Sequence, residues 1–245
     1  MTDFTIKIAG RVVAVSAMFE SSRDYCRDYL CQETPDFSVE ITTEDLVLER
    51  EKSAKTDLAE GVSVRNVSDE HLEITAIQRK IAEKLFAYDV LLFHGSVVSV
   101  DGAAYLFTAK SGTGKSTHTR LWREMLGDRA VMVNDDKPFL CVTEEGVVAC
   151  GSPWNGKHHL GANICMPLKA ICILERGDVN EIEPISAQQA VFMMLQQSNR
   201  PADRKMMNRY MDLIDKICAA VRFYRLRCNM EKGAAELAFK VLSGE

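Results

Sequence analysis

The first part of the chain alternates apolar and polar side chains over short stretches. Three runs have the two-residue period of strands, at residues 4–8, 12–15 and 37–41. Residues 20–30 are compatible with a helix, and the strongly charged stretch 49–60 is expected to lie on the surface. These patterns predict a small N-terminal α+β unit over residues 1–67.

A different pattern begins at Ser68. Its hydroxyl can cap the N-terminus of a helix, and acidic side chains follow it in the first turn. Apolar side chains then recur at helical spacing, at Ile74, Ile77, Ile81 and Leu85. Strand-like apolar runs come later, at residues 91–100, 103–108, 130–133, 139–142, 147–150, 168–174 and 223–228. Helical stretches separate them, at residues 117–126, 187–197, 203–220 and 234–242. We therefore predict an α/β domain over residues 68–245.

The dipeptide Asp101-Gly102 joins two of these apolar runs. Such a dipeptide between strands is typical of a tight β-hairpin. If Val100 pairs with Ala103, the numbers of paired residues sum to 203, and His94 lies opposite Ala109. The register predicts an imidazole at the mouth of the segment that follows the hairpin.

That segment, Ala109 to Thr117, has the pattern of a phosphate-binding loop (Walker A), with alanine in place of the first glycine. A glycine-rich turn between a strand and a helix directs backbone N–H groups toward an anion, and the helix N-terminus adds positive potential. We expect Lys115 to reach the terminal phosphates of a nucleotide and the Ser116 hydroxyl to bind Mg²⁺. The predicted nucleotide-binding residues are Ser111, Gly112, Thr113, Gly114, Lys115, Ser116 and Thr117.

Two adjacent carboxylates follow the next apolar strand. Asn134, Asp135 and Asp136 follow the apolar run 130–133, and Asp135 lies 20 residues beyond Lys115. Carboxylates at a strand end, shortly after a phosphate loop, suit Mg²⁺ binding and phosphoryl transfer. The alternative interpretation is an Asp-rich turn without a catalytic role.

Two further segments are candidates for substrate contact. Residues 151–159 combine turn formers with hydrogen-bond donors, and they predict either a substrate loop or a surface loop anchored by Trp154. The adjacent His158 and His159 do not predict a metal site, because neighbouring side chains diverge. Arg176, just after a strand, is expected either to contact phosphate or to pair with an acidic side chain.

Composition narrows the classes of function. The net charge of −5 argues against nucleic-acid binding, which usually needs a basic face. The chain lacks an apolar run of the roughly 18 residues that a transmembrane helix needs, and residues 1–10 do not resemble a secretory signal. The eight cysteines include no Cys-x-x-Cys pair, and we expect a reducing, cytoplasmic location. Four cysteines in apolar runs are interpreted as buried thiols: Cys141, Cys150, Cys165 and Cys172.

The order of the motifs is specific. A hairpin strand with His94-Gly95 precedes the loop Ser111-Gly112-Thr113-Gly114-Lys115-Ser116, and Asp135-Asp136 follows. Residues 90–175 thereby resemble the kinase domain of HPr kinase/phosphorylase and, more distantly, phosphoenolpyruvate carboxykinase. The resemblance implies a P-loop nucleotide-binding α/β fold distinct from the common parallel P-loop sheet. It also implies ATP and Mg²⁺ as cofactors and often a homo-oligomer.

The resemblance also implies residue roles. Lys115 would bind the β- and γ-phosphates, and Ser116 would bind the metal. One aspartate would be the general base that takes a hydroxyl proton and the other would hold Mg²⁺; we favour Asp135 as the base and Asp136 as the ligand. His94 would lie beside the transferred phosphoryl group.

Departures from the family pattern limit the substrate. Ala109 replaces a glycine, and the Glu-Arg-Gly signature of HPr kinases is missing after the aspartate pair, so HPr is not the expected acceptor. We predict a kinase that transfers the γ-phosphate of ATP to a hydroxyl of a peptide or protein serine or of a small metabolite. The alternative is a non-catalytic nucleotide-binding regulatory or scaffold protein.

Overall fold

The computed structural model describes residues 1–245 except positions 60, 111, 157–158, 202 and 245. The chain divides into two compact units, Met1–Lys84 and Leu85–Glu245. Among the described residues, the first unit contains a three-stranded sheet and the second a nine-stranded sheet. None of the helices within these described ranges has the length and apolar character needed to cross a membrane.

The first unit combines its sheet with helices. Strand β1 (Thr2–Ile8) pairs antiparallel with β2 (Arg11–Ala17), and β3 (Phe37–Glu40) joins β2 in parallel. The three strands predicted from alternation are therefore confirmed. The helical elements are α1 (Glu20–Tyr25), η1 (Arg27–Tyr29), α2 (Thr43–Ala59) and α3 (Asp69–Leu85).

Helix α3 clusters with the first unit, whereas the sequence placed the boundary after residue 67. The buried carboxylate of Glu73 accepts hydrogen bonds from the backbone N–H groups of Met18 and Phe19 and from the hydroxyl of Ser22. These partners lie more than 50 residues earlier in the chain. The helix start was visible in the local pattern, but its partners were not.

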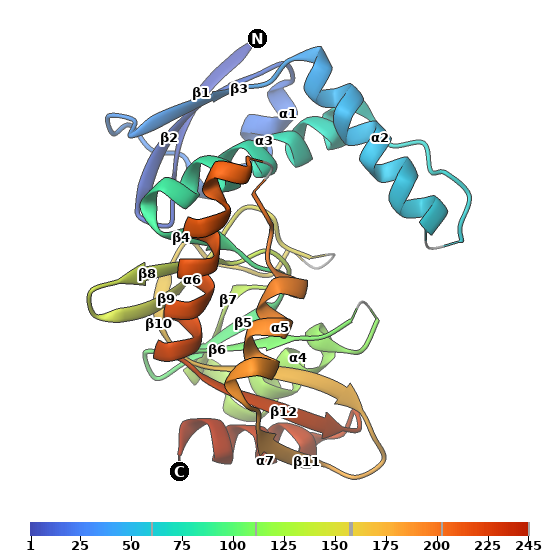
Figure 1. Ribbon diagram of the computed structural model, residues 1–245, viewed down its shortest axis with the longest axis vertical. Coiled ribbons are helices and arrows are strands. Elements are labelled where there is room, and N and C mark those ends of the chain that lie inside the picture. The colour runs from blue at the N-terminus through green and yellow to red at the C-terminus, as the bar shows by residue number, and fades with distance from the viewer. Residues whose placement is uncertain (60, 111, 157–158, 202, 245) are drawn as a thin grey trace. The chain divides into compact units, whose positions relative to one another are not determined.

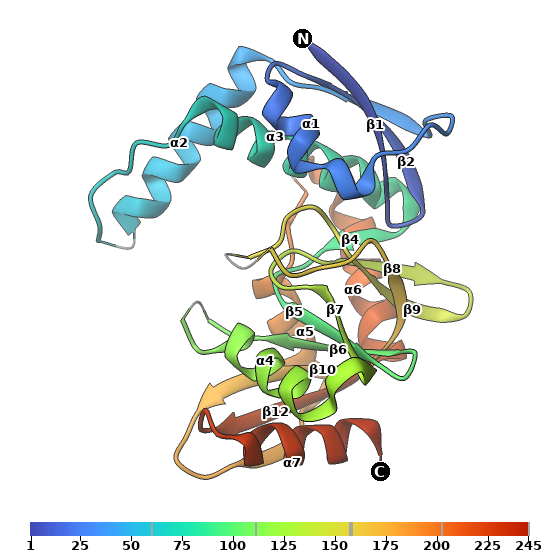
Figure 2. The same cartoon turned by 180° about the vertical axis from the view of Figure 1, so that it is seen from behind.

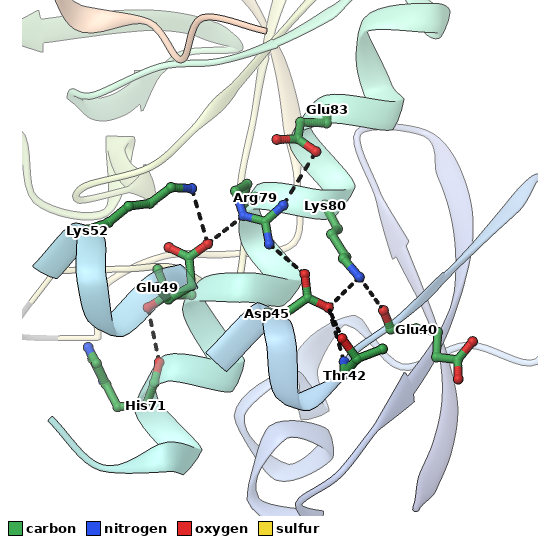
Figure 3. A network of polar contacts seen from close by, with 10 residues as sticks. Glu40, Thr42, Asp45, Glu49, Lys52, His71, Arg79, Lys80 and Glu83 are labelled. Atoms are coloured by element: carbon green, nitrogen blue, oxygen red, sulfur yellow. Dashed lines mark hydrogen bonds and ion pairs between the residues drawn. The ribbon is translucent and has the colours of Figure 1, made fainter. Parts of the chain in front are cut away.

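A network of ion pairs joins α2 to α3 (Figure 3). The Arg79 guanidinium lies 2.8 Å from Asp45 and also pairs with Glu49. Lys80 binds the second carboxylate oxygen of Asp45. The side chains of Asp45 and Glu49 are 10% and 6% exposed, so both charges depend on these partners.

The expectation that residues 49–60 lie on the surface is wrong at two positions. Glu49 and Asp57 are buried, although most of their charged neighbours are exposed. Each has a cationic partner, Arg79 for Glu49 and Arg65 for Asp57. A buried carboxylate is tolerated when a paired cation offsets its lost hydration, and this partner lies outside the local sequence.

The second unit is built on the larger sheet. Its main path runs in the order β4-β8-β9-β10-β6-β5-β7, and β12 pairs with both β10 and β11. The strands are β4 (Val90–Leu92), β5 (Ser96–Val100), β6 (Ala103–Thr108), β7 (Ala130–Asn134), β8 (Phe139–Thr143), β9 (Gly146–Cys150), β10 (Cys165–Arg176), β11 (Glu181–Pro184) and β12 (Arg222–Cys228). The sequence patterns did not predict β11. The run predicted as one strand over residues 91–100 is divided, because β4 pairs with β8 whereas β5 pairs with β6 and β7.

The Asp101-Gly102 hairpin has the predicted register. Strands β5 and β6 pair antiparallel, from Ser96 opposite Phe107 to Val100 opposite Ala103. Asp101 and Gly102 have φ angles of 50° and 83°, as a two-residue type I′ turn requires. Strand β6 has β10 as a parallel neighbour on its other side, so the phosphate loop leaves a mixed sheet.

Helices cover both faces of this sheet. They are α4 (Lys115–Leu126), α5 (Ala187–Gln197), α6 (Met207–Ala220) and α7 (Lys232–Ser243), with short turns η2 (Phe86–Tyr88), η3 (Gly127–Arg129) and η4 (Arg204–Met206). In Figure 1, α5 and α6 lie in front of the strands, and Figure 2 shows α4 on the opposite face. In β6, Leu106 packs into the core with α5 and α6, and Phe107 packs into the core with α4 and α7. Burial on both faces explains the continuous apolar runs of the central strands.

Cys150 and Cys165 form a disulfide between the end of β9 and the start of β10. Their interpretation as buried thiols is therefore wrong, and Cys165 is exposed. The two cysteines lie directly opposite each other because β9 and β10 pair antiparallel at this point. Cys141 and Cys172 are buried and take no part in this disulfide, as expected.

Candidate functional site

The glycine-rich segment connects β6 to α4, as predicted. Gly112 and Gly114 have φ angles of 75° and 118°, a region that favours glycine. Gly114 caps α4 without a side-chain hydrogen bond, which leaves the first N–H groups of the helix available to an anion. Ala109 is not among the described residues with positive φ, so alanine is tolerated there. Ser111 lies outside the described residues.

The other predicted loop residues surround the N-terminus of α4. Thr113 lies in the bend before the helix, and Lys115, Ser116 and Thr117 form its first turn. The Lys115 ammonium lies 3.4 Å from the carbonyl oxygen of Ala109, so this side chain folds back along the loop. The fold therefore brings a cation and the N-terminal N–H groups of α4 to one place, as phosphate binding requires.

Lys115 and the aspartate pair share one electrostatic environment. Burial lowers the pKa of Lys115, the carboxylates of Asp136 and Asp135 oppose this shift, and Lys137 adds to it. Lys115, Asp135 and Asp136, which the sequence assigned to one site, are therefore close enough to interact electrostatically.

Arg176 supports the loop from the neighbouring strand. Its Nη2 atom donates a hydrogen bond to the Gly112 carbonyl at 2.6 Å. Strand β10 places it there because β10 runs parallel to β6, and parallel strands end at the same edge of a sheet. The sequence suggested a phosphate or an acidic partner for Arg176; the structure pairs it with the backbone of the loop, and its contact with a phosphate stays a prediction.

Asp135 is the buried member of the aspartate pair. It follows β7 directly and is 4% exposed. Its Oδ1 atom accepts a hydrogen bond of 2.8 Å from the Ser96 hydroxyl. Its Oδ2 atom is buried and has no hydrogen-bond partner among the described residues. Because an unpartnered buried carboxylate oxygen is costly, this atom is suited to receive a cation or a substrate hydroxyl.

Ser96 connects Asp135 to the helix of the phosphate loop. Its hydroxyl lies 3.1 Å from Thr119 Oγ1, and Thr119 lies 3.3 Å from the Lys115 carbonyl. Ser96 has one hydroxyl hydrogen, which it donates to Asp135, so Thr119 donates to Ser96. Sequence analysis missed Ser96 and Thr119; the only available signal was a hydroxyl in an apolar strand two residues after His94.

Asp136 is more exposed and pairs with His94. The His94 Nε2 atom lies 3.3 Å from Asp136 Oδ1. Burial raises the pKa of Asp136, but the His94 hydrogen bond and the charges of Lys137, His94 and Lys115 outweigh it and lower the pKa below its usual value. Asp136 is therefore ionised at neutral pH.

The position of His94 differs in detail from the extrapolated register. Regular pairing ends at Ser96, and the His94 N–H donates to the carbonyl of Gln197, at 2.7 Å. The His94 carbonyl accepts a hydrogen bond from the hydroxyl of Thr108, the residue before Ala109. The backbone of His94 thus lies beside the start of the loop, while its imidazole contacts Asp136.

Asn134 shapes the turn that carries the aspartates. Its side-chain oxygen accepts hydrogen bonds from the N–H groups of Asp136 and Lys137, at 2.8 and 2.7 Å. Its side-chain nitrogen donates to the carbonyl oxygen and hydroxyl of Ser152. The turn is thereby fixed to the segment that follows β9.

That segment, predicted as a substrate or surface loop, lies against Asp135. A Cβ atom on Gly156 would lie 3.2 Å from Asp135 Oδ2. Trp154 is buried against Phe139 and anchors the segment, as one interpretation expected. His159 belongs to the segment, whereas Lys157 and His158 lie outside the described residues.

Two cavities flank the phosphate loop. The larger, about 710 Å³, is bounded by the loop, the end of β10 and α5, with Lys110, Ile173, Phe192 and Gln197 in its lining. The smaller, about 280 Å³, lies beside α4 and the residues that follow β12. The larger cavity offers space for a molecule that extends from the loop.

The site suits Mg²⁺ only with help from a nucleotide. Within the described ranges, no group of three or more His, Cys, Asp or Glu side chains could hold a metal. Mg²⁺ commonly binds through one or two carboxylates together with phosphates and water. The unpartnered oxygen of Asp135, the ionised Asp136 and the predicted hydroxyl ligand Ser116 match that chemistry.

Comparisons with known proteins identify one family. The family model described as "SynChlorMet cassette protein ScmC" matches residues 62–237. A comparison with curated protein sequences finds no match. Among solved structures, the chain is similar to the HPr(Ser) kinase/phosphatase from Coxiella burnetii, with 11% identity and a TM-score of 0.35. The similarity covers 62% of this chain and 95% of that chain, and it is distant.

Proposed function

The chain belongs to the family of the SynChlorMet cassette protein ScmC, and we propose that it is an ATP- and Mg²⁺-dependent kinase that transfers the γ-phosphate to a hydroxyl group. The observation that carries this proposal is the buried carboxylate of Asp135, with one anchored and one unpartnered oxygen, near a loop that contains Lys115. Phosphoryl transfer depends mainly on positioning and charge neutralisation.

The phosphates of ATP would occupy the N-terminus of α4. The first N–H groups of that helix would bind the phosphate oxygens, and Lys115 would turn from the Ala109 carbonyl toward the β- and γ-phosphates. Arg176 would hold the loop in shape through the Gly112 carbonyl. Ser116, Asp136 and the phosphates themselves would hold Mg²⁺, which would supply neutralisation of the developing negative charge.

Asp135 would orient and deprotonate the acceptor hydroxyl. Ser96 fixes one of its oxygens, and the other receives no hydrogen bond from the residues that the structure describes. His94 would remain beside Asp136 and keep that carboxylate ionised. The acceptor is a serine of a peptide or protein, or a hydroxyl of a small metabolite.

The alternative is a nucleotide-binding regulatory or scaffold protein without turnover. The observation that favours it is Ala109 at the position of a loop glycine. Both functions require nucleotide binding at Lys115, and only the kinase requires Asp135 for turnover.

The test combines binding with turnover. Calorimetric titration with a non-hydrolysable ATP analogue, with and without Mg²⁺, is expected to show Mg²⁺-dependent binding that Lys115→Ala abolishes and Lys240→Ala, at an exposed lysine of α7, retains. Absence of binding to the unaltered protein would refute both functions.

Turnover separates the two functions. Transfer from labelled ATP to a panel of serine peptides and hydroxylated metabolites is expected to disappear in Asp135→Asn, which still binds nucleotide. Asp128→Asn, at an exposed position of η3, provides the control. Binding without consumption of ATP under any of these conditions would favour the scaffold function.

A further inference from the structure

The disulfide encloses the segment that lies against Asp135. Cys150 is the last residue of β9, and Cys165 is the first residue of β10. The loop between them, residues 151–164, thus has its two ends joined covalently. Within the described ranges this is the one disulfide.

The loop makes its contacts at the aspartate turn. Ser152 accepts hydrogen bonds from Asn134 and donates one of 2.6 Å to the Lys137 carbonyl. Further along, Gly156 lies against Asp135, and Gly161 bridges to Asn134. Both halves of the loop therefore hold the turn that carries the two aspartates.

A third sulfur lies beside the disulfide. The Sγ atom of Cys141, in β8, is 3.6 Å from that of Cys150. Cys141 and Cys150 are buried, at 8% and 2% exposure, whereas Cys165 is exposed. An external reagent therefore reaches Cys165 first, and Cys141 is placed to react with Cys150 from inside.

We propose that Cys141, Cys150 and Cys165 form a thiol–disulfide exchange site that reacts with an external dithiol, and that opening the disulfide releases the loop from the aspartate turn. The control of turnover rests on the proposed kinase function; the exchange itself does not. The reagent class is a dithiol, either a small molecule or the exposed Cys pair of a reducing protein.

The exchange is balanced in atoms and electrons. A thiolate of the dithiol attacks the Cys165 sulfur, the Cys150–Cys165 bond breaks, and Cys150 leaves as a thiolate that takes up a proton. The second thiolate of the reagent then attacks the reagent sulfur that is bonded to Cys165. The mixed disulfide breaks, and Cys165 leaves as a thiolate that takes up a proton. Two electrons and two protons pass from the dithiol to the cysteine pair, and the reagent becomes a disulfide.

Cys141 provides an internal exchange without net oxidation. Its thiolate attacks the Cys150 sulfur, forms a Cys141–Cys150 bond and expels Cys165 as a thiolate. The proton lost by Cys141 is matched by the one gained by Cys165. This step moves the cross-link from the ends of the loop to the β8–β9 hairpin, so the loop is released while the protein stays oxidised.

The first experiment measures the cross-link and the loop without reference to ATP. Peptide mapping of the full-length protein under non-reducing conditions is expected to find Cys150–Cys165, with Cys141–Cys150 as a minor species. Amide hydrogen exchange over residues 151–156 and 159–164 is expected to become about tenfold faster after treatment with a dithiol, because constrained segments open less often. Three free thiols in the air-exposed protein, or unchanged exchange after reduction, would overturn the proposal.

Variants identify which sulfurs are responsible. Cys165→Ser is expected to show fast exchange of the loop with or without dithiol, and Cys218→Ser, at a free cysteine of α6, is expected to behave as the unaltered protein. Cys141→Ser should eliminate the Cys141–Cys150 species and retain the dithiol response. A dithiol response that persists in Cys165→Ser would overturn the assignment.

Turnover is measured afterwards on the same samples. The dithiol is expected to lower phosphoryl transfer several-fold in the unaltered protein and not in Cys165→Ser. Loss of loop protection together with full turnover would overturn the proposal that the disulfide controls phosphoryl transfer. Loss of loop protection in a protein that never binds ATP would refute the kinase and leave the exchange site supported.

Discussion

Replacement of Ser96 by alanine tests the core of the proposed site. The Ser96 hydroxyl is fully buried, donates to Asp135 Oδ1 at 2.8 Å and lies 3.1 Å from Thr119. In Ser96→Ala the Asp135 carboxylate loses the one hydrogen bond that its oxygens accept from the described residues. The Thr119 hydroxyl hydrogen, which Ser96 no longer accepts, can then be donated to the Lys115 carbonyl, 3.3 Å away.

The stability loss follows from the type of bond removed. A hydrogen bond to a charged group contributes roughly 1.5–3 kcal/mol, and here the remaining carboxylate stays buried, so we expect a loss of about 2 kcal/mol. For a unit of this size each kcal/mol shifts the midpoint by about 2–4 °C, which gives a decrease of about 4–8 °C. Because Asp135 also loses its orientation, turnover should fall by about 10- to 100-fold with little change in nucleotide affinity.

The control is Ser99→Ala on the same strand. Ser99 is also buried, at 4% exposure, but within the described ranges no side-chain hydrogen bond is found for it. Thermal unfolding by circular dichroism and ATP turnover would be compared for both variants. Equal midpoints and equal turnover in Ser96→Ala and Ser99→Ala would refute the positioning role of Ser96.

Three other predictions follow from single contacts. Arg79→Ala should destabilise the first unit by about 3 kcal/mol, read from hydrogen exchange of its amides, since two buried carboxylates lose a cation. Burial raises the pKa of Asp45, but Lys80, Thr42 and Arg79 lower it to about 2. The stability that Asp45 contributes should therefore be present above about pH 4 and decline as the pH falls toward 2, in an acid titration followed by circular dichroism. Gly156→Ala should reduce turnover more than stability, because its methyl group would crowd Asp135 Oδ2. Unchanged turnover in this variant would show that the loop does not act on the site.

Local patterns in the sequence determined several elements. The Asp101-Gly102 turn fixed the hairpin register, because only one two-residue connection fits between the two apolar runs. Helix α5 lies where the sequence predicted a helix over residues 187–197, and a capping box of Ser186 and Gln189 begins it. The loop from Ala109 to Thr117 was also visible as a connection between a strand and a helix. Its glycines adopt backbone angles that other residues disfavour.

The candidate site was partly visible in the sequence. Lys115, Asp135 and Asp136 act on one another electrostatically, and His94 contacts Asp136. Their catalytic and metal-binding roles stay predictions. The hydroxyl of Ser96 escaped notice because a serine in an apolar strand has no sequence pattern that reveals its partner.

The tertiary structure decided the features that depend on distant partners. Glu73 and Glu49 are buried because their donors lie on other elements, which also brings α3 into the first unit. Cys150 and Cys165 are bonded because β9 and β10 pair antiparallel, and no spacing in the sequence encodes that pairing. Turns, caps and periodicity depend on neighbours in the chain, so the sequence determined them. Burial of charge, pairing of sulfurs and the anchoring of Asp135 depend on which strands and helices meet, and only the folded chain settles that.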